Sequence, residues 1–117
     1  MNVFDINKVY PEFKYPKAYL ELIGLNCVDF GAWYFMSDNQ VEKRIVGLRR
    51  RYPHRKLIPF ARRDDNDDIA CFELEKDKAV QLIHDYASAG YEQRKEYPDI
   101  WAWLHEVMAE KNTEEAR

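Results

Sequence analysis

Apolar and polar residues fall in blocks along the middle of the chain, and the clearest of these blocks predict a β-hairpin. Residues 57–61 (LIPFA) and 69–72 (IACF) are short apolar runs, and every residue between them is charged or an amide. Two apolar runs that flank a polar turn are typical of paired antiparallel strands. The pattern therefore predicts strands over 57–62 and 69–74. Residues 79–86 (AVQLIHDY) predict a third strand of the same kind.

Helical spacing of apolar residues is found on both sides of this strand region. Residues 37–39 (SDN) are suited to capping a helix, an apolar stripe runs from there to Tyr52, and Pro53 ends it. A second stripe predicts a terminal helix over 99–109 that packs on one face of the sheet. That stripe consists of Ile100, Trp103, Leu104, Val107 and Met108.

The other segments have weaker patterns. A short helix is predicted to begin at Pro16 and to close with Gly24 at its C-terminal cap, and Trp33–Met36 is predicted to be a strand. Residues 1–15 are expected to be irregular, 87–97 to be a loop, and 111–117 to be a frayed polar tail. We therefore predict a single α+β domain over all 117 residues, with a small mixed or antiparallel sheet and flanking helices.

Charge is distributed unevenly along the chain, although the net charge is only −3. Residues 43–63 contain nine Lys or Arg and no Asp or Glu, and all the acidic residues lie elsewhere. Such a division fits an anionic partner, and it fits equally well a basic segment that docks on the chain's own acidic parts. The segment Arg49–Arg63 could bind nucleic acid. A dedicated nucleic-acid binder is usually basic overall, however, so this interpretation is disfavoured.

The N-terminal residues, the apolar runs and the cysteines indicate the cellular compartment. The first residues (MNVFDINKVY) lack the basic and apolar blocks of a signal peptide, and no apolar run is long enough to span a bilayer. Cys27 and Cys71 have apolar neighbours, which predicts reduced, buried thiols rather than a disulfide. We expect a cytoplasmic protein with no membrane contact.

Two patterns that could carry chemistry fail on inspection. The acidic residues from Asp64 onward have part of the spacing of a calcium loop, but Ile69 stands where that loop needs glycine. Cys71 and His84 could meet across neighbouring strands, yet an apolar-strand cysteine is usually inert, and Asp85 should point away from His84. We predict no metal, no cofactor and no enzymatic activity.

Five segments of the chain share motifs with a known superfamily. They are WYFM (33–36), LRRRYP (48–53), LIPFARRDDNDDIACFE (57–73), VQLIHDYASAGYE (80–92) and DIWAWL (99–104). In this order they resemble the SUKH superfamily of bacterial immunity proteins and fungal cell-wall-assembly regulators, which share one α+β fold. Asp68 stands where the family's turn ends in Asp. The turn's usual glycines are replaced by residues 65–67 (DND).

The resemblance implies a binding module without catalytic machinery, and many members neutralise a toxin, often a nuclease, encoded beside them. Two alternatives remain: an adaptor without a toxin partner, and the nucleic-acid binder. A homodimer also stays open. An acidic turn could occupy the cationic groove of a nuclease, although the same turn residues could serve only to stabilise the hairpin. The predicted partner-binding residues are Arg62, Arg63, Asp64, Asp65, Asn66, Asp67 and Asp68. The secondary candidates are Arg49, Arg50, Arg51, His84, Asp85, Tyr91 and Glu92.

Overall fold

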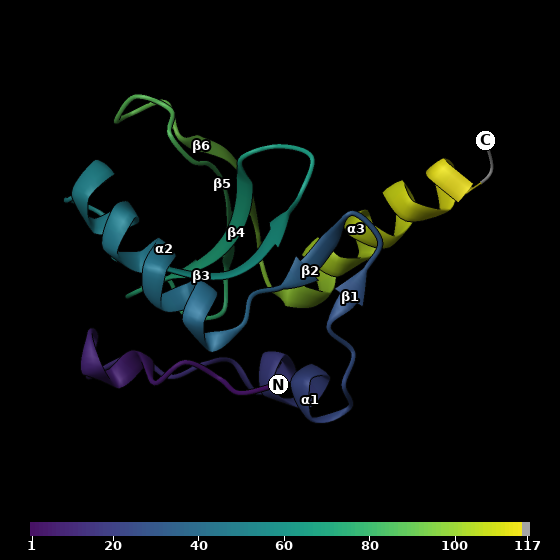
Figure 1. Cartoon of the computed structure of the whole chain (residues 1–117), viewed down its shortest axis with the longest axis horizontal. Helices are drawn as coiled ribbons and strands as arrows, with labels where there is room; N and C mark the ends of the chain where they lie inside the picture. Colours follow the sequence, from purple (N-terminus) through teal and green to yellow (C-terminus); the bar gives the residue numbers. More distant parts are fainter. Residues whose placement is uncertain (116–117) are drawn as a thin grey trace.

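A single antiparallel sheet forms the centre of the molecule (Figure 1). The computed structural model describes residues 1–115, with side chains as far as Asn112, and within these residues the sheet has six strands in the order β1-β2-β3-β4-β5-β6. Each strand therefore pairs with its neighbours in the sequence, which confirms the predicted α+β class. The strands are β1 (Asp29–Phe30), β2 (Trp33–Phe35), β3 (Leu57–Arg63), β4 (Asp68–Glu73), β5 (Val80–His84) and β6 (Gln93–Tyr97).

The predicted hairpin is the centre of this sheet. β3 and β4 pair from Leu57 opposite Glu73 to Arg62 opposite Ile69, with a shift in register between Pro59 and Ala61. Proline has no N–H to donate to the ladder, so an irregularity is expected beside it. The hairpin places its polar turn, residues 64–67, at the same end of the sheet as the end of β5.

Three α-helices flank the sheet within the described residues: α1 (Lys17–Gly24), α2 (Asp38–Arg51) and α3 (Ile100–Glu115). The predicted cap of α2 is Ser37, whose Oγ accepts a hydrogen bond from the Gln40 backbone N–H at 3.3 Å. The Gln40 side chain accepts one in return from the Ser37 backbone at 2.8 Å, which completes a capping box. A short 3-10 turn, η1 (Ile6–Lys8), interrupts the otherwise irregular N-terminal segment.

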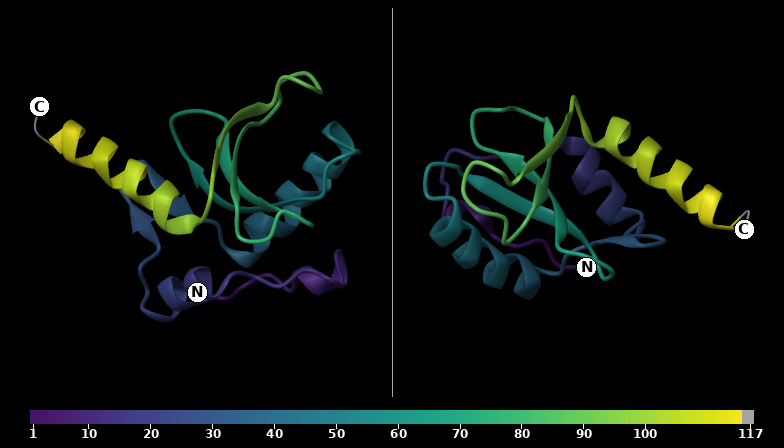
Figure 2. Two further views of the ribbon diagram at one scale, coloured as in Figure 1. Left: turned by 180° about the vertical axis from the view of Figure 1, so that it is seen from behind. Right: turned by 90° about the horizontal axis from the view of Figure 1, so that it is seen from above.

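Both faces of the central strands are buried, by different elements. On one face, Leu48 and Tyr52 of α2 pack with residues of β3, β4 and β5. On the other face, Phe60 and Phe72 pack with Trp103 of α3, with α1 and with the N-terminal segment. In Figure 1, α2 and α3 accordingly lie on opposite sides of the sheet. The two views of Figure 2 show the C-terminal part of α3 extending beyond the sheet.

Two predicted boundaries are wrong because polar residues were taken to indicate irregular structure. The predicted loop 87–97 contains β6, in which four of the five residues are exposed and only Tyr97 is buried. Such an edge strand needs ladder hydrogen bonds on one side only, and charged side chains protect its open side. The predicted polar tail 111–117 is helical as far as Glu115, and residues 116–117 lie outside the described residues.

Two local expectations near α1 also need correction. Gly24 is the last residue of the helix rather than its left-handed cap, and Asn26 takes the left-handed conformation instead, with φ 58°. Asparagine tolerates this region better than most residues with a side chain. Cys27 is exposed, whereas Cys71 is buried as predicted, and both thiols are free.

Candidate functional site

The acidic turn between β3 and β4 is held in place by contacts on both sides. Arg63 donates two hydrogen bonds to Asp65, at 2.7 and 2.8 Å, and these lower the pKa of the Asp65 carboxyl. The Tyr34 hydroxyl of β2 donates to Asp64 at 2.8 Å. Two of the predicted binding residues, Arg63 and Asp65, therefore neutralise each other.

The last residue of the turn belongs to a cluster on β4, β5 and β6. Asp68 Oδ1 lies 2.8 Å from Nδ1 of His84 and 2.8 Å from Nε of Arg94. Its backbone N–H donates to the Asn66 side chain at 2.8 Å. These contacts give Asp68, Asn66 and His84 a role in holding the turn. Asp67, in contrast, is exposed, and its carboxylate makes no hydrogen bond or ion pair within residues 1–115.

Asp85, directly after β5, is the centre of a buried ion cluster. Its carboxylate is fully buried and accepts two hydrogen bonds from Arg51 and one from Arg44, all at 2.7 to 2.8 Å. Burial would lower the pKa of Arg51, but the hydrogen bonds to Asp85 outweigh it and raise the pKa. Asp85 was a candidate for partner binding, and the structure shows that it has no exposed side chain to offer.

Tyr86 was predicted to end the strand 79–86 and was not among the candidate site residues, but β5 ends at His84 and Tyr86 lies in the turn that follows. Its side chain is 61% exposed, and its backbone is left-handed with φ 68°. The Tyr86 N–H donates to Asp85 at 2.8 Å, and the Arg51 guanidinium lies 4.1 Å from the centre of its ring. A bulky residue with a positive φ is unusual and marks strain that surrounding contacts must hold. The Asp85 cluster therefore fixes an exposed aromatic ring beside the acidic turn, since Asp85 also donates from its N–H to the Asp67 carbonyl at 3.1 Å.

A second buried ion cluster lies on the same face of the sheet. Arg55 donates two hydrogen bonds to Glu73 at 3.0 Å and one to Glu92 at 2.9 Å. Burial would raise the pKa of Glu92, but hydrogen bonds from its own backbone N–H, from Arg55 and from Gly90 outweigh it and lower the pKa. Glu92 was also a candidate for partner binding, and it is buried in this cluster.

The lowered pKa of Glu92 predicts how stability responds to acid. A carboxyl whose pKa is lower in the folded state stabilises the fold above its unfolded-state pKa, about 4.5. This contribution is lost as the pH falls through the folded-state value. We expect the melting temperature to be flat from pH 7 to about 5 and to fall below it. Glu92→Gln should lower the melting temperature at pH 7 and make the acid decline shallower. An identical decline in the parent and the variant would contradict this role.

The other secondary candidates lie apart from these clusters. Arg50 and Tyr91 are exposed, and the Arg49 guanidinium lies 5.8 Å from the ring centre of Tyr10 in the N-terminal segment. The Cys71–His84 pair that the sequence suggested does not form, because Cys71 is opposite Gln81 and His84 is opposite Asp68. Burial also raises the pKa of the Cys71 thiol, which keeps it protonated. Within the described residues, no group of three His, Cys, Asp or Glu side chains could hold a metal ion.

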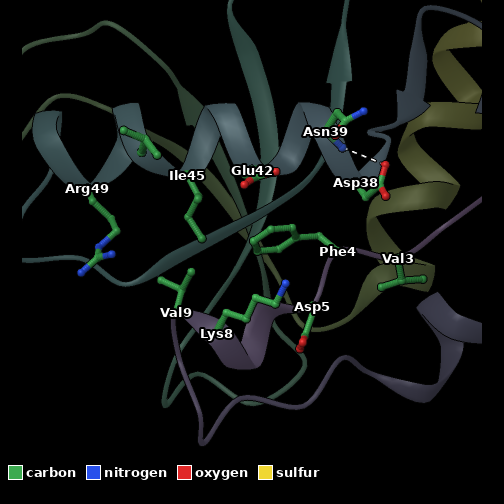
Figure 3. Close-up of a pocket in the computed structure, with 11 residues that line it drawn as sticks. Val3, Phe4, Asp5, Lys8, Val9, Asp38, Asn39, Glu42, Ile45 and Arg49 are labelled. Carbon is green, nitrogen blue, oxygen red and sulfur yellow. Dashed lines mark hydrogen bonds between the residues drawn. The ribbon is translucent and has the colours of Figure 1, made fainter.

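A cavity of about 440 Å³ lies between the N-terminal segment and α2 (Figure 3). Figure 3 shows Phe4, Val9 and Ile45 facing one another across it, while charged side chains of both signs surround them. Among these are Glu42 of α2 and Lys8 of the N-terminal segment. An apolar floor with a mixed rim selects no particular ligand chemistry.

Comparison with protein-family models, with curated proteins and with solved structures found no significant match. Among the helices of residues 1–115, none is long and apolar enough to cross a membrane.

Proposed function

We propose that this chain is a non-enzymatic protein-binding module of the SUKH type, an immunity protein that inhibits a toxin encoded beside it. The observation that carries the proposal is a rigid acidic turn next to an exposed aromatic ring. Asp64 and Asp67 present carboxylates to solvent, and Tyr86 presents its ring from the adjoining loop. These three residues are called the acidic–aromatic surface below.

The energetics of binding favour such a surface. Tyr is enriched among the residues that dominate interface energy, and exposed carboxylates accelerate association with a cationic partner. The Arg63–Asp65 pair, the Asp68 cluster and the Asp85 cluster already order the backbone beneath the surface. A partner therefore does not have to pay the entropy of ordering the turn when it binds. A nuclease toxin suits this surface because its nucleic-acid groove is cationic.

The alternative of a nucleic-acid surface along Arg49–Arg63 is less well supported. Arg51, Arg55 and Arg63 each form ion pairs with carboxylates of the chain itself. The charge of Arg55 and of Arg63 is therefore already compensated, each by two carboxylates, and the charge of Arg51 is compensated in part. This is expected if the basic segment docks on the chain's own acidic residues. An adaptor without a toxin would use the same acidic–aromatic surface, and the neighbouring reading frame distinguishes it from an immunity protein.

The direct test is co-expression of the neighbouring reading frame with and without this chain in a bacterial host. An immunity protein should restore growth when the neighbouring product is toxic. If that product is toxic and this chain does not protect, the immunity proposal is wrong. If the neighbouring product is harmless, the adaptor becomes the better proposal.

The acidic–aromatic surface can be tested with a purified toxin domain. Asp64→Asn/Asp67→Asn removes two charges but keeps amide oxygens that can accept the same hydrogen bonds, so the melting temperature should not change. Association should slow about tenfold at low ionic strength, and salt should reduce the difference.

The matched control is Glu12→Gln/Glu75→Gln, which removes the same charge from two exposed residues beside the β4–β5 turn, at the opposite end of the sheet. If both double variants slow association equally, overall charge is responsible and the binding surface lies elsewhere. Unchanged association by Asp64→Asn/Asp67→Asn would exclude the turn from the interface.

A further inference from the structure

A concave site with an excess of positive charge lies beside the Asp85 cluster, between α2 and the end of β3. Its cavity is about 290 Å³, and four cationic side chains line it together with the ring of Tyr86. Lys43, Arg44 and Arg51 come from α2, and Arg62 comes from β3. Four cations around one concave site create a local positive potential in a chain whose net charge is negative.

Two of these cations are held in fixed positions. Arg44 and Arg51 share the single buried carboxylate of Asp85, so their combined charge is only half compensated. Arg51 reaches Asp85 by lying across Gly47, where a Cβ atom would be 2.7 Å from the Arg51 Nη2. Glycine inside a helix is destabilising relative to alanine. At this position it provides the space that the Arg51 guanidinium occupies.

Arg62 supplies an unused hydrogen-bond donor. Its Nε is buried and has no hydrogen-bond partner among the described residues. Its guanidinium lies 3.9 Å from the exposed carboxylate of Asp64, a distance beyond a direct hydrogen bond. A buried donor without a partner is destabilising, and a bound acceptor would remove that cost. Among the residues that the structure describes, Asp64 and Asp85 are the carboxylates that form ion pairs with these four cations, so positive charge remains in excess.

We propose that this cavity binds a phosphate group, either free phosphate or the phosphoryl group of a small phosphate monoester. Phosphate is compact, carries up to two charges at neutral pH and has several acceptor oxygens, which match the donors left on four cations. Guanidinium groups suit phosphate geometry, and Arg44, Arg51 and Arg62 supply three of them. The site does not depend on the proposed immunity function.

The test is titration of the full chain with inorganic phosphate at low ionic strength. Binding is measured by calorimetry and by the changes in the NMR chemical shifts of α2 and Tyr86. Lys43→Gln and Arg62→Gln should each weaken phosphate binding about tenfold, because each removes one charge-assisted contact. Neither side chain belongs to the Asp85 cluster, so both variants should fold. The control is Arg50→Gln, which removes the same charge from an exposed position on α2, and it should bind phosphate like the parent.

Two further ligands identify what the cavity recognises. If a nucleoside 5′-monophosphate binds as tightly as phosphate, the cavity recognises the phosphoryl group alone. If it binds more tightly, the protein also contacts the nucleoside. Both results support the site. A glutamate-containing peptide that binds as tightly as phosphate would overturn the assignment and identify a carboxylate site. No binding at millimolar phosphate, or equal loss in Arg50→Gln and Arg62→Gln, would also overturn it.

Discussion

Replacing Trp103 with alanine should lower the free energy of unfolding by about 3–5 kcal/mol, the range for removing a large aromatic side chain from a packed core. Trp103 is 1% exposed, and its ring centre lies 5.5 Å from that of Trp33 and 5.4 Å from that of Phe60. These contacts join α3 to β2 and β3. The truncation would therefore leave a cavity between the helix and the sheet that neighbouring rings cannot fill. Urea unfolding monitored by circular dichroism measures the change.

The matched control is two residues earlier in the same helix. Trp101 is 51% exposed, so Trp101→Ala should change stability by less than about 1 kcal/mol. If Trp103→Ala does not fold at 25 °C, Trp103→Phe gives a measurable intermediate loss. Equal unfolding midpoints for Trp103→Ala and Trp101→Ala would mean that α3 does not cover the core.

The parts of the fold that were predicted correctly are those with a local apolar signal. The β3–β4 hairpin was identified because two apolar runs flank a turn without an apolar residue, and both strands are buried. The terminal helix was identified because its stripe, including Trp103, faces the core. β6 was missed for the opposite reason. Its residues up to Glu96 are polar and exposed, so its pairing with β5 gives no signal within the strand itself.

The candidate site was only partly predictable, because its charges are organised over long sequence distances. Asp85 and Glu92 resemble exposed acidic residues in the sequence, and no local pattern shows that each is buried against arginines of a distant segment. Arg44 is 41 residues away from Asp85, and Arg55 is 37 residues away from Glu92. The uneven charge distribution was compatible with this pairing, but it fitted an anionic partner equally well. It could not show which Lys and Arg residues form ion pairs and which line the cavity between α2 and β3.

Tyr86 was missed for a different physical reason. What distinguishes it is its left-handed backbone and its exposed ring, which the residue type does not reveal, and the buried Asp85 carboxylate accepts a hydrogen bond from its N–H. The two adjacent residues therefore act together. The buried Asp85 carboxylate stabilises the turn, and the Tyr86 ring is exposed on the acidic–aromatic surface.

This support predicts a second large loss of stability. Asp85→Ala should lower the free energy of unfolding by about 3–5 kcal/mol, the range for removing one partner of a buried ion pair. The variant leaves Arg44 and Arg51, whose side chains are only 15% and 25% exposed, without the carboxylate that compensates them. It also removes the acceptor of the Tyr86 N–H, so the left-handed turn loses a contact that holds it.

Two comparisons separate the buried charge from a general effect at this turn. Asp67→Ala removes the same side chain from an exposed residue whose carbonyl accepts the Asp85 N–H, and it should change stability by less than about 0.5 kcal/mol. Adding Arg44→Gln to Asp85→Ala should recover part of the loss, because one uncompensated charge is removed with it. If Asp85→Ala and Asp67→Ala unfold at the same urea concentration, the Asp85 cluster does not stabilise the fold. If Arg44→Gln causes a further loss in the Asp85→Ala background, Arg44 stabilises the fold by packing rather than through its charge.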